Sequence, residues 1–352
     1  MVEIISKMLA NNKFSAIKEM LSEMNIVDIA ALIEEMEPEN QVRLFRLLPK
    51  TSSADAFSYL PGDIQGNIVD AITNSELEFL MEDMFLDDAV DFLEEVPANV
   101  VTRVLAHTKP DTRKLINKFL QYPENSAGSI MTIEMVSFPE TYTVKQAIEM
   151  IRKTALDKET IYTCYCMDDK RKLVGTIPLR KLIVAPENQI VKDIMEDDEQ
   201  LIFVNTMDDQ EEVAAIAKKY DLLSIPVVDK EERLVGIITI DDIVDVIEDE
   251  NTEDFEKMAL LLPSEDSYLK TGIFTLYKNR IVWLLILMVS ATFTGQIIEG
   301  FEDKLSMIAG LTASIPMLMD TGGNCGNQVS TLVIRGLALG DIHIKDFFKI
   351  IW

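Results

Sequence analysis

The segment MDDKRKLVGTIPLRKLIV, residues 167–184, recurs as VDKEERLVGIITIDDIVDV at residues 228–246. In each copy a β-branched run, a turn containing Asp, a second run with Leu-Val-Gly and a short apolar helix follow one another. We therefore predict that residues 126–250 form an α/β region of two similar halves, which can pack as a pseudo-twofold pair. The matched positions are Asp168 with Asp229, Leu173-Val174-Gly175 with Leu234-Val235-Gly236, Leu182 with Ile243, and Ile130-Met131 with Ile194-Met195.

The repeat resembles a tandem pair of CBS domains, and the resemblance covers the whole α/β region. In the second copy Gly236, Thr239 and Asp242 form a G-x-x-T-x-x-D pattern. In CBS domains this pattern resembles the ribose- and phosphate-contacting edge of an adenine-nucleotide site. The first copy has Pro178 and Lys181 at the matching places, so at most one such site is expected. The alternative is that Thr239 simply caps the following helix.

Residues 1–125 are predicted to be all-helical. Apolar residues recur at helical spacing in segments such as AIKEMLSEM, QVRLFRLL and VVTRVLA. Short helices that stack in pairs form a small superhelix, which is the architecture we expect here. Prolines interrupt the segment close to the expected helix boundaries, at Pro38, Pro49, Pro61, Pro97 and Pro110.

The stretch IPMLMDTGGNCGNQVSTLVIRGLALG, residues 315–340, is an apolar run interrupted by polar residues and glycines. Because Pro316 lacks an amide donor, we expect a kink near it and a broken helix beyond. Broken backbone at membrane depth is tolerated where it lines a wet cavity, and a carboxylate there marks an ion route. Helix packing is the alternative role for the glycines. The expected pore-lining residues are Asp320, Asn324, Asn327 and Gln328.

Two membrane spans are predicted, at about residues 281–298 and 305–334. Basic residues flank them on the side of the long preceding segment, at Lys278 and Arg280 before the first span and at Arg335 after the second. By the positive-inside rule, the spans form a hairpin and the preceding residues are cytosolic. The sequence therefore predicts a multi-pass protein of the cytoplasmic membrane with cytoplasmic N-terminal domains.

The part before the spans is strongly acidic. The chain has a net charge of −27, and residues 269–352 hold seven Lys and Arg against six Asp and Glu, so the negative excess lies in residues 1–268. Charge of this sign repels nucleic acid and attracts cations. Two distant histidines and the cysteines Cys164, Cys166 and Cys325 provide no nucleophile-plus-base pair, disulfide framework or zinc site, so we expect no enzyme.

Carboxylates gather at the starts of two helices predicted in the second repeat. Asp209 and Glu211 open the first helix, and Asp242 and Asp245 open the next. Like charges at helical spacing repel, so such clusters are costly unless they are solvated or bridged by a cation. Mg²⁺ suits loose carboxylate clusters because it keeps several of its waters. These residues alone leave two alternatives open: a solvated acidic face or a set of Mg²⁺ ligands.

The order of the parts resembles the MgtE family of magnesium channels and transporters. The family's membrane motif, P-x-L-x-x-T-G-G-N-x-G-N-Q followed by R-x-L-A, is present between Pro316 and Ala338. Q-E-E-V at residues 210–213 and D-D-x-x-D at residues 241–245 add to the match. The implied regions are a helical N-terminal domain (1–125), two CBS domains (126–186 and 187–247), a connecting helix (248–278) and the start of a transmembrane domain (279–352).

The resemblance implies a homodimeric, Mg²⁺-selective pore in the lipid bilayer, gated by cytosolic Mg²⁺. Ions held between the helical domain, the CBS pair and the connecting helix would keep the pore shut, and the acidic faces would separate when Mg²⁺ is scarce. Further membrane helices are implied, so we expect the membrane domain to be incomplete here. Carried over residue by residue, the metal ligands are Asp55, Asp87, Asp91, Asp209, Glu211, the backbone carbonyl of Lys218, Asp221, Asp242, Asp245, Glu250, Glu253 and Asp254.

A membrane-anchored regulator is the alternative function. In that case the CBS pair senses an adenine nucleotide such as ATP, and the spans serve only as anchors. The two hypotheses differ in their ligand, because a magnesium sensor binds Mg²⁺ without nucleotide whereas a nucleotide sensor binds ATP at the second CBS copy. Separate binding measurements with ATP and with Mg²⁺ discriminate between them.

Overall fold

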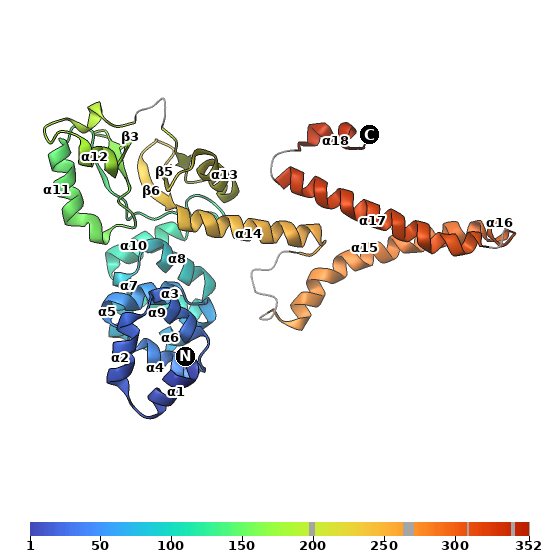
Figure 1. The fold of residues 1–352 in the computed structure, drawn as a ribbon, viewed down its shortest axis with the longest axis horizontal. Coiled ribbons are helices and arrows are strands. Elements are labelled where there is room, and N and C mark those ends of the chain that lie inside the picture. Colours follow the sequence, from blue (N-terminus) through green and yellow to red (C-terminus); the bar gives the residue numbers. More distant parts are fainter. Residues whose placement is uncertain (197–200, 263–270, 308–309, 339–341, 352) are drawn as a thin grey trace. The chain divides into compact units, whose positions relative to one another are not determined.

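The structure is a computed structural model that describes residues 1–196, 201–262, 271–307, 310–338 and 342–351. The chain divides into two compact units, Met1–Val244 and Asp245–Trp352. Figure 1 follows the chain from short helices at the N-terminus, through two small sheets, to long helices at the C-terminus. This order confirms the predicted sequence of an all-helical domain, an α/β pair and a helical C-terminal region.

The N-terminal helices stack in two alternating rows. α3 packs on α5, α5 on α7 and α7 on α9, while α4 packs on α6, α6 on α8 and α8 on α10. This is the packing of a short superhelix, as predicted. Proline begins α4 and α10, where the first turn needs no amide donor. The helices are α1 (Val2–Ala10), α2 (Phe14–Glu23), α3 (Ile26–Glu34), α4 (Pro38–Phe45), α5 (Lys50–Ser58), α6 (Gly62–Ala71), α7 (Asn74–Asp83), α8 (Leu86–Glu95), α9 (Ala98–His107) and α10 (Pro110–Phe119).

Aromatic packing holds α8 in the superhelix. The Phe92 ring on α8 meets the Phe57 ring edge to face, with centroids 5.1 Å apart. Both side chains are almost fully buried, and aromatic pairs of this geometry add about 0.5–1.5 kcal/mol beyond their buried area. Asp87, Asp88 and Asp91 lie on the same helix, so this core contact also fixes the helix from which they project.

Each half of the α/β region forms a three-stranded sheet of the same topology. β1 pairs in parallel with β2, and β2 pairs antiparallel with β3; β4, β5 and β6 repeat this pattern. The antiparallel register shifts at matching places, Cys166/Met167 and Val227/Val228. The elements are β1 (Ser137–Pro139), α11 (Val144–Thr154), η1 (Ala155–Asp157), β2 (Thr163–Met167), β3 (Leu173–Pro178), α12 (Leu179–Val184), η2 (Val191–Asp193), β4 (Val204–Asn205), α13 (Gln210–Tyr220), β5 (Ser224–Val228) and β6 (Leu234–Thr239).

The two halves are intertwined through the segments that precede them. Thr132, before the first half, forms a backbone bridge with Ile237 on β6 of the second half. A Cβ on Gly236 would lie 2.6 Å from Thr132 O, and one on Gly175 would lie 2.7 Å from Glu196 O. Glycine is therefore needed at both repeat positions for the close approach of another backbone.

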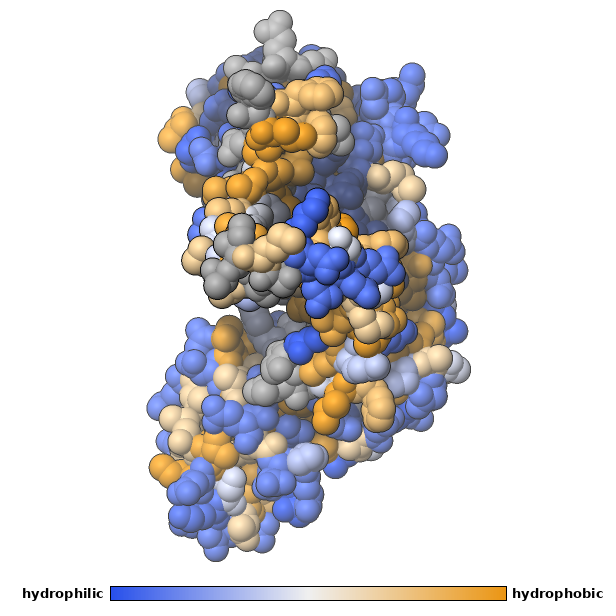
Figure 2. All heavy atoms as spheres, turned by 90° about the vertical axis from the view of Figure 1, so that its right-hand side faces the viewer, coloured by the Kyte–Doolittle hydropathy of each residue, from blue (hydrophilic) through white to orange (hydrophobic). Residues whose placement is uncertain are grey.

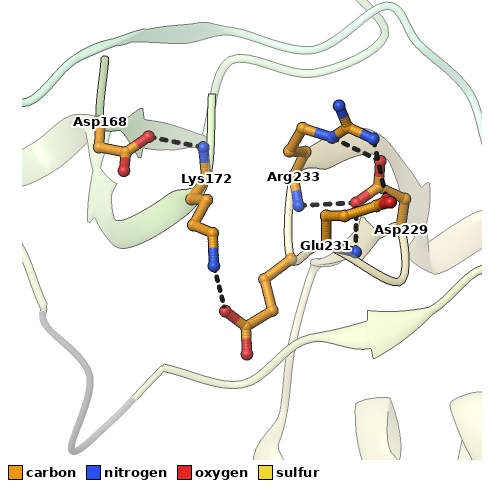
Figure 3. Close-up of polar contacts among 6 residues, drawn as sticks. Asp168, Lys172, Asp229, Glu231 and Arg233 are labelled. Carbon is orange, nitrogen blue, oxygen red and sulfur yellow. Dashed lines mark hydrogen bonds and ion pairs between the residues drawn. The ribbon is translucent and has the colours of Figure 1, made fainter. Parts of the chain in front are cut away.

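The hairpin turns of the two halves lie side by side (Figure 3). The Asp168 carboxylate accepts a hydrogen bond from Lys172 N, and the Asp229 carboxylate accepts one from Arg233 N. Each aspartate thus closes its own turn, which explains why the repeat has Asp at both places. Lys172 Nζ also pairs with a Glu232 carboxylate oxygen at 2.8 Å across the two hairpins.

The C-terminal part is helical. The predicted connecting helix, 248–278, differs from the structure, because α14 continues directly from β6 and already ends at Met258; residues 263–270 lie outside the described residues. The elements are α14 (Ile240–Met258), α15 (Ile273–Gly300), α16 (Glu302–Ser306), α17 (Leu311–Ala338), η3 (Ile344–Asp346) and α18 (Phe347–Ile351).

The predicted spans correspond to α15 and α17. Among the described residues α15 alone is long and apolar enough to cross a membrane by length and hydropathy. The expected break within 315–338 was wrong, because α17 runs as one helix through Pro316 and Gly322. In an apolar setting a helix satisfies its backbone internally, which outweighs the cost of about 1 kcal/mol per glycine. Apolar side chains on these helices lie open on the surface (Figure 2).

Candidate metal centre

Three aspartates project from one face of α8. Asp87 and Asp88 lie in its first turn, and Asp91 follows one turn later. The Oδ1 atom of Asp87 is buried and has no hydrogen-bond partner. Burial raises the pKa of Asp87 well above its usual value, and repulsion from Asp88, Asp242 and Glu159 adds to this. A buried carboxylate oxygen without a donor is costly, so a cation or a donor placed at Asp87 Oδ1 would stabilise this site.

The pKa values of the neighbouring aspartates are raised for the same reasons. Burial, followed by repulsion from Asp242 and Asp55, raises the pKa of Asp88 to about 6. Burial and repulsion from Asp242 and Asp88 likewise raise the pKa of Asp91 to about 7. By its accessible surface Asp91 is nevertheless exposed, so water and ions reach its side chain. Burial first, then repulsion from Asp83, also raises the pKa of Asp55.

The α/β pair contributes the other side of the cluster. Glu159 follows η1 in the first half, and Asp241 and Asp242 lie in the first turn of α14. Burial, then repulsion from Asp241, Asp88 and Asp242, raises the pKa of Glu159 to about 7. We call this set the acidic junction; it consists of Asp55, Asp87, Asp88, Asp91, Glu159, Asp241 and Asp242.

The structure brings four sequence-predicted ligands together in the acidic junction: Asp55, Asp87, Asp91 and Asp242. Sequence reasoning missed Asp88, Glu159 and Asp241. For Asp88 and Asp241 a signal was available, since each is adjacent to a predicted ligand in an Asp-Asp pair. Glu159 carries no such signal, because only the fold brings the segment after η1 to α8 and α14.

The donor chemistry of the acidic junction suits Mg²⁺. Hard carboxylate oxygens are the ligands that this cation prefers, and it commonly keeps several waters between itself and the protein. Within the part of the chain that the structure describes, no group of three or more His, Cys, Asp or Glu is arranged to hold a metal ion directly. Carboxylates that repel one another are expected to stand apart, so bridging through bound water or a closer approach is needed.

Other predicted ligands lie on α13. The Asp209 side chain accepts a hydrogen bond from Glu211 N and so caps the start of this helix. Lys218 lies in its last turn, and Asp221 ends it in the left-handed conformation, with φ 52°. Aspartate tolerates this conformation better than most residues. These positions give each residue a structural role, and their role as ligands stays a prediction.

The connecting-helix ligands all lie on α14. Glu253 pairs with Lys257 one turn later, with 2.6 Å between Oε1 and Nζ. Asp254 faces Arg335 of α17, with 3.6 Å between Oδ2 and Nη1. Glu250 also lies on this helix, as does Asp245, which was predicted as a ligand of the CBS pair. Glu253 and Asp254 are thus each paired with a protein cation.

The predicted pore-lining residues lie along one face of α17. Asn324 follows Asp320 by four residues, and Asn327 and Gln328 follow Asn324 by three and four residues, which places them on the same side of a helix. Asn324 Nδ2 donates a hydrogen bond to Asp320 Oδ2 at 3.3 Å. The helix thus presents a polar stripe within an otherwise apolar sequence.

The G-x-x-T-x-x-D residues each make a local contact. Asp242 Oδ2 accepts hydrogen bonds from Thr239 Oγ1, at 2.7 Å, and from Thr239 N, at 3.3 Å. This pairing caps the start of α14, which was the alternative to nucleotide contact. Gly236 makes room for the backbone of Thr132. A nucleotide role for the three residues stays a prediction.

Two of the three cysteines are buried, and Cys325 is exposed. Cys164 and Cys166 are buried on β2, and burial raises the pKa of each thiol to about 12. All three cysteines, including Cys325 on α17, are free. Thiols held this strongly protonated are poor metal ligands and nucleophiles.

Family models match most of the chain. The MgtE intracellular N domain matches residues 24–125, the CBS domain matches residues 127–188 and 191–249, and a family described as divalent cation transporter matches residues 315–352. These matches follow the order of the helical superhelix, the two sheets and α17.

Two curated relatives match almost the whole chain. The magnesium transporter MgtE of Thermus thermophilus is 37% identical over 339 residues, which are 95% of this chain and 75% of the relative. The magnesium transporter MgtE of Bacillus subtilis is 32% identical over 348 residues, 95% of this chain and 76% of the relative.

Solved structures resemble the part before the long C-terminal helices. The cytosolic domain of the Mg²⁺ channel MgtE in complex with ATP is 36% identical, with a TM-score of 0.66, and the match covers 70% of this chain and all of that one. The soluble part of a magnesium transporter also has a TM-score of 0.66, at 30% identity, and the match covers 71% of this chain and 97% of that one.

Proposed function

Because this chain belongs to the MgtE family of magnesium transporters, we propose that it carries Mg²⁺ across the cytoplasmic membrane under the control of cytosolic Mg²⁺. The acidic junction is the observation that carries the regulatory part of this proposal. It joins carboxylates from the superhelix to carboxylates from the CBS pair, and it contains a buried oxygen without a partner. Transport, and not catalysis, is the activity that this set of residues supports.

Mg²⁺ acts on the acidic junction by removing repulsion. When the ion is abundant it neutralises carboxylates of α8 and α14 and holds the superhelix against the CBS pair. When the ion is scarce, the same charges repel at short range, and the two parts separate. A ligand that binds the closed arrangement better than the open one shifts the population toward the closed one. The ion is therefore both cargo and regulator.

The ligand set is proposed to extend along α13 and α14. Their carboxylates have the chemistry for Mg²⁺, and α14 leads from the last CBS strand toward the membrane helices, so ions bound along it link sensing to gating. The buried, unpartnered Asp87 Oδ1 on α8 supports one member of the set. The proposed ligands are Asp55, Asp87, Asp91, Asp209, Glu211, the Lys218 carbonyl, Asp221, Asp242, Asp245, Glu250, Glu253 and Asp254.

The membrane part is proposed to be multi-pass and dimeric. The length and hydropathy of α15 support one span. The polar stripe of α17, which includes Asp320, supports a second helix that lines an ion route. A stripe of this kind avoids lipid when it faces a pore between two copies of the chain. The CBS domains and superhelix are then cytosolic, as the basic flanks of the spans indicate.

ATP is proposed as a second ligand of the CBS pair, because the similar cytosolic domain was solved in complex with it. Thr239 and Asp242 at the start of α14 are the candidates for its ribose and phosphates. Equilibrium dialysis with ATP, with and without Mg²⁺, tests this. If the change Thr239→Ala leaves ATP binding unchanged, ATP does not bind at the start of α14 as proposed.

Protection from protease tests the regulatory proposal. Mg²⁺ at about millimolar concentration should slow cleavage between the superhelix and the CBS pair, since the closed junction hides the connecting backbone. Changing Asp242 and Asp245 to Asn together should abolish this protection and leave Mg²⁺ uptake by cells active at high internal Mg²⁺. If cleavage of the wild-type protein does not respond to Mg²⁺, the regulatory proposal is wrong.

A further inference from the structure

Arg335 joins the end of α17 to α14. Its Nη1 donates a hydrogen bond to Asn251 Oδ1 at 2.9 Å and lies 3.6 Å from Asp254 Oδ2. Asn251 and Asp254 are three residues apart, so they share one face of α14. The guanidinium therefore sits between two acceptors on successive turns of the same helix.

The geometry of the Arg335–Asp254 contact allows another cation to replace the guanidinium. The Asn251 amide holds the guanidinium in place, whereas the separation from the Asp254 carboxylate is longer than a charge-assisted hydrogen bond. The Arg335 and Asp254 side chains are 42% and 24% exposed, so water and ions reach the pair. A cation that binds carboxylates more closely than this can displace the guanidinium.

We propose that Arg335 is an internal counter-cation that competes with Mg²⁺ for the Asp254 carboxylate and so sets the Mg²⁺ concentration at which the protein responds. This inference rests on the proposed function, which supplies the ion. Without Mg²⁺, Arg335 neutralises Asp254 and ties α14 to α17. When the ion binds Asp254, the guanidinium is released to Asn251 and solvent. Arg335 is thus a positioning residue for the regulatory site and is not itself a metal ligand.

Competition between Arg335 and Mg²⁺ determines whether removing the arginine raises or lowers the apparent affinity for Mg²⁺. Every Mg²⁺ ion that binds Asp254 must first replace Arg335, so the apparent affinity is reduced by the strength of the ion pair. For a partly exposed pair this reduction is at most about fivefold. Removing the arginine should therefore make the protein more sensitive to Mg²⁺, whereas mere damage to the fold would make it less sensitive.

The test is the Mg²⁺ concentration that gives half-maximal protease protection of the purified protein in detergent. Arg335→Gln should lower this midpoint about two- to fivefold, and Arg335→Lys, which keeps the charge, should stay near the wild type. In the Asp254→Asn background the change Arg335→Gln should have no effect. Asn251→Ala, which removes only the amide that holds the guanidinium, should lower the midpoint by a smaller factor.

Lys349→Gln is the matched control. It removes one positive charge from α18, where Lys349 makes no hydrogen bond or ion pair among the described residues, so the midpoint should not move. An unchanged or raised midpoint for Arg335→Gln overturns the inference while leaving the proposed function intact, provided that the wild type responds to Mg²⁺. A shift that persists in the Asp254→Asn background also overturns it. A wild type without any Mg²⁺ response overturns both.

Discussion

Asp87, Asp88 and Asp91 carry charges on which the proposed regulation by Mg²⁺ depends. They project from a helix that is fixed by the Phe57–Phe92 contact, so they cannot relax away from the CBS pair without moving the superhelix. Their charges are therefore removed in one of two ways: by a bound cation or by a proton. The pKa values of these carboxyl groups are raised because the fold holds them close together and partly buried.

Because these pKa values are raised in the closed junction, the closed state binds more protons than the separated state. Its stability is then full below about pH 4 and falls as the pH rises through the values of about 6 for Asp88 and about 7 for Asp91 and Glu159. Without divalent cations, protease cleavage at the junction should become faster from about pH 5 to pH 8. Asp91→Asn should flatten this dependence.

Glu19→Gln is the control for this pH series. Glu19 is an exposed carboxylate on α2 whose side chain makes no hydrogen bond or ion pair in the described part of the chain. Its change should leave the profile as in the wild type. A cleavage rate that falls with rising pH would contradict the direction of the raised pKa values.

The two CBS copies form one structural element because a buried hydrogen bond joins their sheets. Tyr165 Oη on β2 and Ser224 Oγ on β5 lie 2.7 Å apart, and both residues are buried. The crossing of Thr132 onto β6 joins the same two copies through the backbone. The junction with α8 therefore receives carboxylates from a single body, although Glu159 and Asp242 come from different copies.

Breaking the shared hydrogen bond should loosen this element. Tyr165→Phe leaves a buried hydroxyl of Ser224 without its partner, so we expect the free energy of unfolding to fall by about 1–3 kcal/mol. Ser224→Ala should cost a similar amount, and the double variant less than the sum, because the second change removes the orphaned group. Urea unfolding of the four proteins measures this. Strict additivity would show that the two hydroxyls are not coupled.

Net charge is the property of the whole molecule on which the proposed regulation by Mg²⁺ depends. The net charge is −27, and the negative excess lies in residues 1–268. Lysine and arginine neutralise only part of the surface, since exposed pairs such as Glu39–Arg43 contribute little. Repulsion over the cytosolic lobes therefore opposes compaction wherever cations are scarce.

Screening of the negative charges by a monovalent salt should reproduce part of the compaction expected with Mg²⁺. In about 0.5 M NaCl the Debye length falls to roughly 4 Å, so long-range repulsion between acidic lobes weakens and the metal-free protein should become more compact. Small-angle scattering in detergent measures the radius of gyration. Millimolar Mg²⁺ should compact the protein further than the same ionic strength of NaCl, because it bridges carboxylates at short range. Equal effects of the two salts would argue for screening alone.

Much of this molecule could be predicted from the chain. The repeat and the helical superhelix follow from pattern and family motif. Asp87 and Asp242 were named as ligands from the family motif, and that role stays a prediction. The break in α17 was predicted wrongly, because local helix-breaking residues lost to the backbone hydrogen bonds of a long helix. Glu159 was missed because it lies in a segment without periodicity, far in sequence from α8 and α14.

By itself the sequence determined the classes of structure and the chemistry, since periodicity, repeat and charge are written locally along the chain. Only the tertiary structure decided which carboxylates share one space and which cation each one meets. It put Glu159 beside Asp88 and Asp241, and it put Arg335 against Asp254, 81 positions away in the chain. The physical reason is that Coulomb repulsion and hydrogen bonding depend on separation in space, and folding sets that separation.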